Sequence, residues 1–419
     1  MVANQSDFGK RLRTLRQEQG MSQAQLAGDE ISAGYLSRLE SGARPPTPKI
    51  IAYLAERLDV SPSAFDGPPV ADEAPVAALV RAITATPDGE GQVGEVLNRL
   101  AYHQTDLSLP LRWLALWSLA GIRSEGATHE GQLSLGQELL QTAEESGIPE
   151  LRVRSLVLVS RLYRSVGDMK AANACADDAY STAIEHDVPR DDTVRALMVL
   201  ISTEAETSRL HDALKYVADL EVLSKHTTRT MRVEALWTAA SVYVRQGNHA
   251  AAAARLAEAL ALSSSADDLR LWMRLRFAAA SLYLQMHPSR LSDAQQILKE
   301  VEPALALIGD AGQYLEFRTI RAHAHFQAGE LDAARTLCEE IRPDAKKLEF
   351  RDMIRFEVLV HLLDIISGQV EAGVRAIEVL AGKAHEASNM DLAAEIWKNL
   401  AETLAFVQSA KSGPGAIDS

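Results

Sequence analysis

The sequence predicts an all-α protein in which a small N-terminal domain precedes a long helical solenoid. Three observations support this fold class: short, capped helices follow one another within residues 1–66, a turn residue recurs at regular intervals through the rest of the chain, and no strand pattern is found after Val76. A chain of 419 residues is also too long for one ordinary hydrophobic core, which favours two or more domains.

Two short helices joined by a tight turn are predicted near the N-terminus. Ser22 is a good N-cap for a helix over Gln23–Ala27, and Gly28 ends that helix. Ser32 then caps a second helix, which stops at Gly42. Helices joined in this way can pack almost at right angles, so that the second helix projects outward.

Three further helices are predicted around this pair. They cover Asp7–Gln19, Pro48–Leu58 and Pro62–Phe65, the last with a proline at its first position. Together with the motifs SQAQLA, YLSRLESG and LDVSP, this order of five helices resembles the Cro/C1-type helix-turn-helix (XRE) family from Phe8 to Phe65. The resemblance implies a five-helix, lambda-repressor-like fold that binds double-stranded DNA.

In that family the second helix of the pair lies in the major groove, which implies that its first residues meet base edges. Ala33 and Gly34 lack the polar side chains that the family often uses there, although Ala33 can contact a thymine methyl group. Arg38 is the best candidate for a bidentate contact with guanine, and a phosphate contact or a surface ion pair is the alternative. Gln23 and Arg44 are expected to contact phosphates. The predicted DNA-contacting residues are Gln23, Ser32, Ala33, Gly34, Tyr35, Ser37, Arg38 and Arg44.

The distribution of charge constrains how such a domain binds DNA. The formal net charge is -14, but residues 1–66 hold eight basic and eight acidic side chains, so the excess lies after residue 66. An acidic remainder repels DNA, and affinity must therefore come from one face and from two copies. We expect a homodimer on a near-palindromic operator. By resemblance to the family, Arg16 and Glu40 form a partly buried ion pair between the first and third helices.

The remaining composition favours the cytoplasm and indicates no enzyme. The N-terminus lacks the apolar core of a signal peptide, and no apolar run approaches the ~18 residues of a membrane helix. Two distant cysteines, Cys175 and Cys338, do not make a disulfide framework. No Walker-type loop, HExxH motif or nucleophile elbow is found, so we expect no catalytic residue, no cofactor and no metal site.

A segment rich in proline and acidic residues separates the predicted domains. Residues 66–75, DGPPVADEAP, have almost no apolar pattern. We therefore expect a helix-turn-helix domain over residues 1–66, a linker over 67–75, helical repeats over 76–408 and a disordered tail over 409–419.

A small residue follows a turn residue by five positions throughout the second domain. These small residues are Gly131, Ala172, Ala213, Ala252, Ala294, Ala334 and Gly373. Their period is about 40 residues, which predicts a helical solenoid with two helices per unit. Units such as LYRSVGDMKAANACADDA and HFQAGELDAARTLCEEI resemble tetratricopeptide repeats, although the period exceeds the roughly 34 residues of that family.

The resemblance implies that the first helix of each pair lines a concave groove. The groove-facing positions of each repeat are expected six, ten and thirteen residues before the turn residue, which is Ser289 in the repeat that contains Arg276. The predicted groove residues are Arg154, Arg161, Arg195, Ser202, Glu234, Trp237, Ser241, Arg276, Tyr283 and His323. Arginine recurs at the position thirteen back, which favours binding of a peptide's carboxylate or acidic side chains. The alternative is that these arginines pair with acidic residues of the next repeat.

A DNA-binding domain joined to such a solenoid resembles the bacterial (RRNPP-like) regulators that sense short signalling peptides in quorum sensing. The resemblance implies a transcriptional regulator whose repeat domain binds a short peptide or other small ligand, and whose occupant controls the paired DNA-binding domains. A second interpretation makes the repeats a docking scaffold or adaptor that recruits or sequesters a partner protein at DNA. A third has the repeats sequester or stimulate a signalling enzyme.

Overall fold

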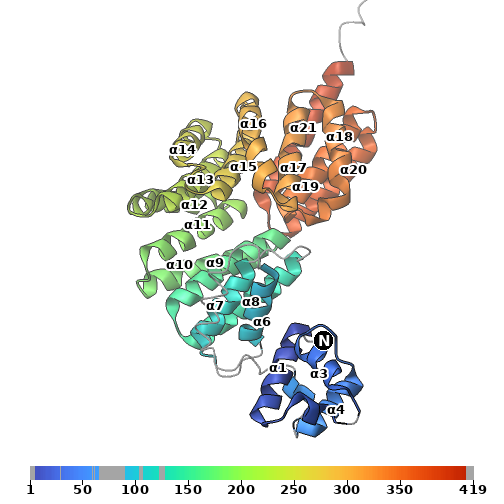
Figure 1. The fold of residues 1–419 in the computed structure, drawn as a ribbon. Helices are drawn as coiled ribbons and strands as arrows, with labels where there is room; N and C mark the ends of the chain where they lie inside the picture. Colours follow the sequence, from blue (N-terminus) through green and yellow to red (C-terminus); the bar gives the residue numbers. More distant parts are fainter. Residues whose placement is uncertain are drawn as a thin grey trace, which may run out of the picture. The chain divides into compact units, whose positions relative to one another are not determined.

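A computed structural model describes residues 5–28, 30–58, 60, 62–65, 90–102, 107–121 and 128–411 (Figure 1). All regular secondary structure in these residues is helical, which confirms the predicted all-α class. The chain divides into two compact units, residues 1–96 and residues 97–419. The predicted linker and most of the predicted tail lie outside the described residues. Within the described part of the chain, no helix combines the length and the apolar character needed to span a membrane.

Up to Phe65, the described residues of the first unit form five short helices in the predicted order. They are α1 (Gln5–Glu18), α2 (Gln23–Ala27), α3 (Ala33–Glu40), α4 (Pro48–Leu58) and the 3-10 helix η1 (Pro62–Phe65). The expected caps are formed, because the Ser22 hydroxyl accepts the Gln25 N–H at 3.2 Å and the Ser32 hydroxyl accepts the Tyr35 N–H at 3.1 Å. The helices therefore begin and end within two residues of the predicted positions.

A small apolar core holds these helices together. The fully buried leucines of this core are Leu12, Leu26, Leu36, Leu39, Leu54 and Leu58. Burial of each such side chain contributes about 2 kcal/mol. The rings of Phe8 and Phe65 pack with their centroids 5.3 Å apart, which joins the first helix of the unit to the last.

The second unit is a solenoid of helix pairs (Figure 1). The helix α6 (Glu90–Tyr102), which contains the boundary between the two units, precedes the first pair. The first helices of the pairs are α7 (Leu109–Gly121), α9 (Pro149–Val166), α11 (Arg190–Glu206), α13 (Arg229–Arg245), α15 (Leu269–Gln285), α17 (Ala311–Gln327) and α19 (Phe350–Ile366). Their partners are α8 (His129–Ser146), α10 (Met169–Glu185), α12 (Leu210–Leu223), α14 (His249–Leu262), α16 (Leu291–Ile308), α18 (Leu331–Ile341) and α20 (Val370–Glu386). The last helix is α21 (Met390–Lys411), and from α9 onward each first helix packs on its partner and on the first helix of the next repeat, as in tetratricopeptide arrays.

Small residues after the turns let the paired helices approach closely. The alanines at this position, Ala172, Ala213, Ala252, Ala294 and Ala334, are completely buried. Gly373 is also buried, and a Cβ atom there would lie 2.5 Å from the Ile365 side chain. Gly131 differs from the prediction because it is exposed in the first turn of α8, whose buried glycine is Gly136.

Several contacts join parts of the solenoid that are far apart in sequence. α9 contacts α19, and α11 contacts α21, although solenoid repeats ordinarily contact only their neighbours. Gly167, at the end of α9, has a φ of 88°, and a Cβ atom there would lie 2.6 Å from the Phe350 ring. A ring nitrogen of His129 also lies 3.3 Å from the carbonyl oxygen of Lys347. These contacts close the solenoid on itself.

Candidate DNA-binding surface and ligand groove

The helix α3 presents one face to the core and the other to solvent. Its two leucines are buried, whereas Ala33, Gly34, Ser37 and Arg38 are exposed. The Arg38 side chain forms no hydrogen bond or ion pair with any residue that the structure describes, so its guanidinium is available to a partner. The predicted base-contacting residues therefore share one accessible surface.

The loop after α3 brings a second arginine to the residues of this surface. The Arg44 N–H donates to the Arg38 carbonyl at 3.2 Å. The Arg44 guanidinium carbon lies 4.8 Å from the centre of the Tyr35 ring. Such a cation–π contact contributes about 0.5–1 kcal/mol at an exposed site, which is enough to bias the position of a long side chain.

A buried ion pair fixes α1 against α3, as the family resemblance implies. Arg16 donates to Glu40 at 2.6 and 3.1 Å and to the Met21 carbonyl at 2.7 Å. Burial opposes the charged carboxylate, but hydrogen bonds from Arg16 and Gln23 outweigh this effect and lower the pKa of Glu40. The Gln23 amide donates to Glu40 at 2.8 Å, so the structure places this predicted phosphate-contacting side chain against the ion pair.

Two glycines set the geometry of the first unit. A Cβ atom on Gly9 would lie 2.4 Å from the Leu39 carbonyl oxygen, so α1 approaches α3 as closely as only glycine allows. Gly28 has a φ of 57°, in the left-handed region that favours glycine. Next to it, the Tyr53 hydroxyl donates to the Ala27 carbonyl at 2.8 Å and satisfies the end of α2.

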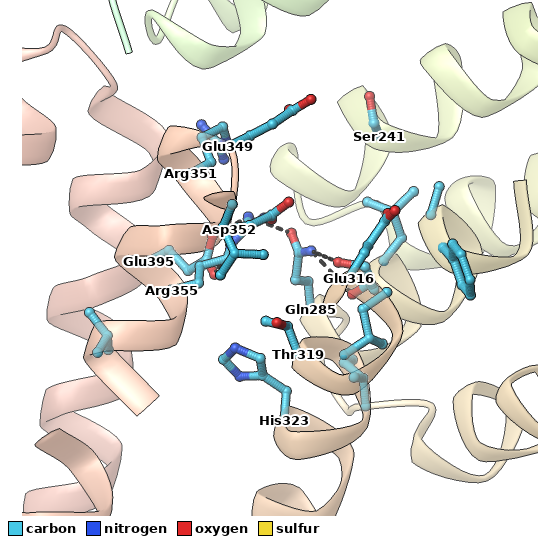
Figure 2. A pocket seen from close by; sticks show the side chains of 18 of the residues that line it. Ser241, Gln285, Glu316, Thr319, His323, Glu349, Arg351, Asp352, Arg355 and Glu395 are labelled. Atoms are coloured by element: carbon cyan, nitrogen blue, oxygen red, sulfur yellow. Dashed lines mark hydrogen bonds and ion pairs between the residues drawn. The ribbon is translucent and has the colours of Figure 1, made fainter. Parts of the chain in front are cut away.

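The inner helices of the solenoid surround a groove of about 2580 Å³. Its walls come mainly from α9, α11, α13, α15, α17, α19 and α21, all within the second unit. In Figure 2, Glu316, Thr319 and His323 on α17 face Asp352 and Arg355 on α19. Typical small-molecule pockets hold about 300–1,000 Å³, so this groove suits an extended ligand.

The same two positions of successive inner helices supply much of the lining. The position six before the turn lines the groove in every repeat from α9 to α19, with the side chains of Arg161, Ser202, Ser241, Ser281, His323 and Leu362. The position ten before the turn supplies a mostly apolar floor, formed by Met198, Trp237, Phe277, Thr319 and Val358. The predicted residues that lie in the groove are Arg161, Ser202, Glu234, Trp237, Ser241 and His323.

Arg276 and Tyr283 do not line the groove, contrary to the prediction. Five residues join α15 to α16, whereas two or three join the other pairs from α9 to α20. The turn therefore falls two positions before Ser289, and two positions rotate a helical side chain by about 200°. The residues of α15 that line the groove at the equivalent positions are Arg274, Phe277 and Ser281.

Arg154 and Arg195 also lie outside the groove, because they belong to an ion-pair cluster around Asp192. Arg154 donates two hydrogen bonds of 2.9 Å to the carboxylate of Asp192, which is buried on the next inner helix. A nitrogen of Arg195 lies 3.8 Å from the same carboxylate. Arg154 therefore pairs with an acidic residue of the next repeat, which was the alternative interpretation of the sequence.

Arg276 and Arg355 have partners as well. The Arg276 guanidinium stacks on Trp272, with its carbon 3.7 Å from the ring centre, and lies 3.6 Å from Glu300. Arg355 lines the groove but donates to Glu395 on α21 at 2.7 and 2.9 Å. The arginines thirteen positions before the turns thus mainly form ion pairs within the protein.

Five charged side chains form an ionic network that joins non-neighbouring repeats. Arg164 donates to Glu206 at 2.6 and 3.1 Å, and Arg245 lies 3.5 Å from the same carboxylate. Arg245 also donates to Asp391 at 2.8 Å, and Arg351 makes two hydrogen bonds of 2.8 Å to Asp391. Burial opposes charge on Asp391, but Arg351 and Arg245 outweigh it and lower its pKa. The sequence did not predict this network. Its one signal in the sequence is that Arg164, Glu206 and Arg245 each lie two or three positions before a turn residue.

Burial favours the neutral forms of three side chains that line the groove, those of His323, Glu349 and Asp352. The His323 Nε2 atom is buried and has no hydrogen-bond partner among the described residues. Burial, together with the nearby Arg355 charge, lowers the pKa of His323 to about 4. Burial likewise raises the pKa of the Glu349 and Asp352 carboxyl groups.

These features define the class of protein as a helix-turn-helix domain followed by a tetratricopeptide-like solenoid with an internal groove. Residues 7–66 match the family described as a helix-turn-helix domain, which confirms the resemblance for the first unit. The HTH-type transcriptional regulator PrpR of Mycobacterium tuberculosis (strain ATCC 25618 / H37Rv) is 43% identical over 58 residues. The match spans 14% of this chain and only 12% of PrpR.

Two solved structures are similar to this chain. A Rap protein complexed with competence and sporulation factor is similar over 96% of this chain and 99% of that chain, with a TM-score of 0.51 and 10% sequence identity. This likeness concerns the fold alone. Bacillus thuringiensis PlcR, in complex with the peptide PapR7 and DNA, matches over 76% of this chain and 99% of that chain. Its identity is 13% and its TM-score is 0.31.

Proposed function

We propose that the protein is a sequence-specific, DNA-binding transcriptional regulator whose solenoid binds a signal. Two copies place their α3 helices in major grooves of a near-palindromic operator, and a short peptide or other small ligand occupies the groove. The protein acts in the cytoplasm as a binding protein and not as an enzyme. The observation that carries the proposal is a helix-turn-helix match over residues 7–66 on the same chain as a groove of about 2580 Å³.

The exposed face of α3 supports the DNA-binding part of the proposal. Arg38 has an unengaged guanidinium that suits the two acceptors of guanine in the major groove. Arg44 and Ser37 lie near it for contacts with phosphates. The Gln23 side chain is engaged by Glu40, so the first turn of α2 contributes through its backbone N–H groups.

The groove supports the signal-binding part. Its lining combines an apolar floor with a column of hydroxyl side chains, Ser202, Ser241 and Ser281. An extended peptide presents alternating backbone N–H and C=O groups and needs both kinds of surface. A ligand that binds one arrangement of the repeats better than another shifts the population of that arrangement, which couples the groove to DNA binding.

Selection of duplexes from a random DNA pool by the purified full-length protein tests the proposal. We expect a two-fold symmetric sequence to be enriched, and Arg38→Ala to weaken binding to that sequence about tenfold or more, because a bidentate base contact is worth about 1–3 kcal/mol. Arg13→Ala is the matched control: it removes one exposed charge from α1, and its side chain has no hydrogen bond or ion pair among the described residues.

The thermal unfolding temperature of Arg38→Ala should equal that of the wild type, since its side chain supports no described contact. Selection without any enriched sequence would contradict the proposal. If Arg38→Ala and Arg13→Ala lost the same amount of affinity, Arg38 would contribute only nonspecific electrostatic attraction to DNA and no base-specific contact.

A further inference from the structure

Arg161 differs from the other arginines that the repeat pattern singles out. It lies on α9 at the position six before the turn and lines the groove. Arg154, Arg276 and Arg355 are held by carboxylates at 2.7–3.6 Å. Arg161 has no hydrogen bond or ion pair with any residue that the structure describes. Its charge is therefore available to something that enters the groove.

The charges around Arg161 do not neutralise it. Glu234 is the acidic side chain that acts on it most strongly, and Glu234 is shared with Arg274 at 3.8 Å. Arg164 and Arg195 add further positive charge, although each has its own acidic partner. The surrounding protein displaces enough water to lower the pKa of Arg161, even though the side chain still reaches the water of the groove.

This arrangement has an energetic consequence. An arginine does not lose its proton in a protein, so this accessible guanidinium without a partner keeps its full charge in the groove. An oxyanion from a ligand can pair with that charge and accept two parallel N–H hydrogen bonds from it. Lysine has the same charge but lacks the planar guanidinium group. Arg161→Lys therefore keeps the charge and removes the bidentate geometry.

The neighbouring lining fits a peptide around such an anion. Ser202 and Ser241 lie on the two following inner helices at the same repeat position and offer hydroxyl groups to a peptide backbone. Trp237 provides an apolar wall, and the Arg274 guanidinium carbon lies 6.0 Å from its ring centre. Two cations and an aromatic ring therefore flank the same part of the groove.

We propose that Arg161 and Arg274 form an oxyanion subsite, and that the ligand of the groove is a short peptide anchored there by a carboxylate. The carboxylate is that of the chain end or of an acidic side chain, which present the same group to the subsite. The inference rests on the proposed function only in taking the groove as the ligand site.

Three pools of random heptapeptides test the subsite with the full-length protein. The first pool has free C-terminal carboxylates and no acidic residues, the second is the same pool with amidated ends, and the third is amidated but contains aspartate and glutamate. Peptides retained by the protein are identified by mass spectrometry after size exclusion. We expect retention from the first or the third pool, which distinguishes the two sources of carboxylate, and little from the second.

Variants of α9 connect retention to the subsite. Arg161→Gln should lower the affinity for a retained peptide about tenfold or more, the usual range for a lost charge-assisted hydrogen bond, and Arg161→Lys should recover part of it. The control is Arg152→Gln on the same helix, whose partners Asp178 and Thr182 lie on α10 away from the groove lining. Its affinity should equal that of the wild type.

The outcomes separate this inference from the proposed function. Equal retention of the amidated neutral pool, or unchanged affinity in Arg161→Gln, overturns the oxyanion subsite and leaves a peptide groove in place. Failure of the wild type to retain peptides from any pool overturns both the subsite and the peptide ligand. A separate measurement of DNA binding decides whether the proposed role as a transcriptional regulator is retained.

Discussion

The two units of the chain stabilise their functional surfaces in different ways. In the first unit the buried ion pair joins Arg16 to Glu40, 24 positions apart, and the candidate site is an exposed helix face. In the second unit the ionic network joins Arg245 to Asp391, 146 positions apart, and the candidate site is an interior groove. The first surface depends on local helix packing, whereas the second exists because distant repeats are held together.

This difference predicts how each unit responds to substitution. A change in the ionic network alters the closure of the whole solenoid, because α9, α11 and α13 are tied to α19 and α21 there. A change on the exposed face of α3 should alter the proposed contact with DNA and leave the first unit folded.

Removal of the Asp391 carboxylate should have the largest effect on stability. Asp391→Asn leaves Arg245 and Arg351 largely buried without their shared counter-ion, which costs about 3–5 kcal/mol in a buried pair. Urea unfolding should show this loss in the solenoid. Asp267→Asn breaks an exposed pair with Arg229 and should cost less than about 1 kcal/mol. Equal losses in the two variants would show that the network does not close the solenoid.

The contact of α9 with α19 gives a second test. Gly167→Ala and Gly247→Ala both place an alanine at a turn with positive φ, so they share the cost of that backbone conformation. Only Gly167→Ala also drives a methyl group into the Phe350 ring, because nothing lies within 4 Å of a Cβ atom at Gly247. We expect Gly167→Ala to be less stable by a further 1–3 kcal/mol or so. Small-angle scattering should show expansion in that variant alone, and matched stabilities would exclude the closing contact.

A third effect concerns pH. His323 has a folded pKa of about 4 against an ordinary value of 6.5, so the unfolded chain takes up its proton first as pH falls. The free energy of unfolding therefore decreases as pH falls from 6.5 to 4, by up to roughly 3 kcal/mol from this group. His323→Gln should remove that part of the pH dependence. Urea unfolding at several pH values measures it, and the comparison of the two proteins cancels the opposing contribution of Glu349 and Asp352. Parallel pH curves would show that His323 is not held neutral.

Local sequence was enough to predict the first unit. The caps at Ser22 and Ser32, the glycine turn and the spacing of the leucines are all interactions within a few positions, and each is formed. The Arg16–Glu40 pair followed from the family resemblance. For the solenoid, the buried alanines after the turns were likewise predictable, because the same close packing of paired helices recurs from α9–α10 to α17–α18.

The groove was only partly predictable, for two physical reasons. The two extra loop residues after α15 shift the helix register, and a small shift in register exchanges the inner and outer faces of a helix. This is why Arg274 lines the groove in place of Arg276. The ionic network depends on how far the solenoid curves, which no single repeat specifies.

The central claim is that the occupant of the closed groove controls binding of the helix-turn-helix domain to DNA. The most direct test measures the Kd of the full-length protein for its selected duplex at fixed salt, with and without a peptide retained from the pools. We predict a change of about fivefold or more for the wild type and for Arg152→Gln, and no change for Arg161→Gln at the same peptide concentration. An identical Kd for the wild type in the presence and absence of saturating peptide would contradict the claim.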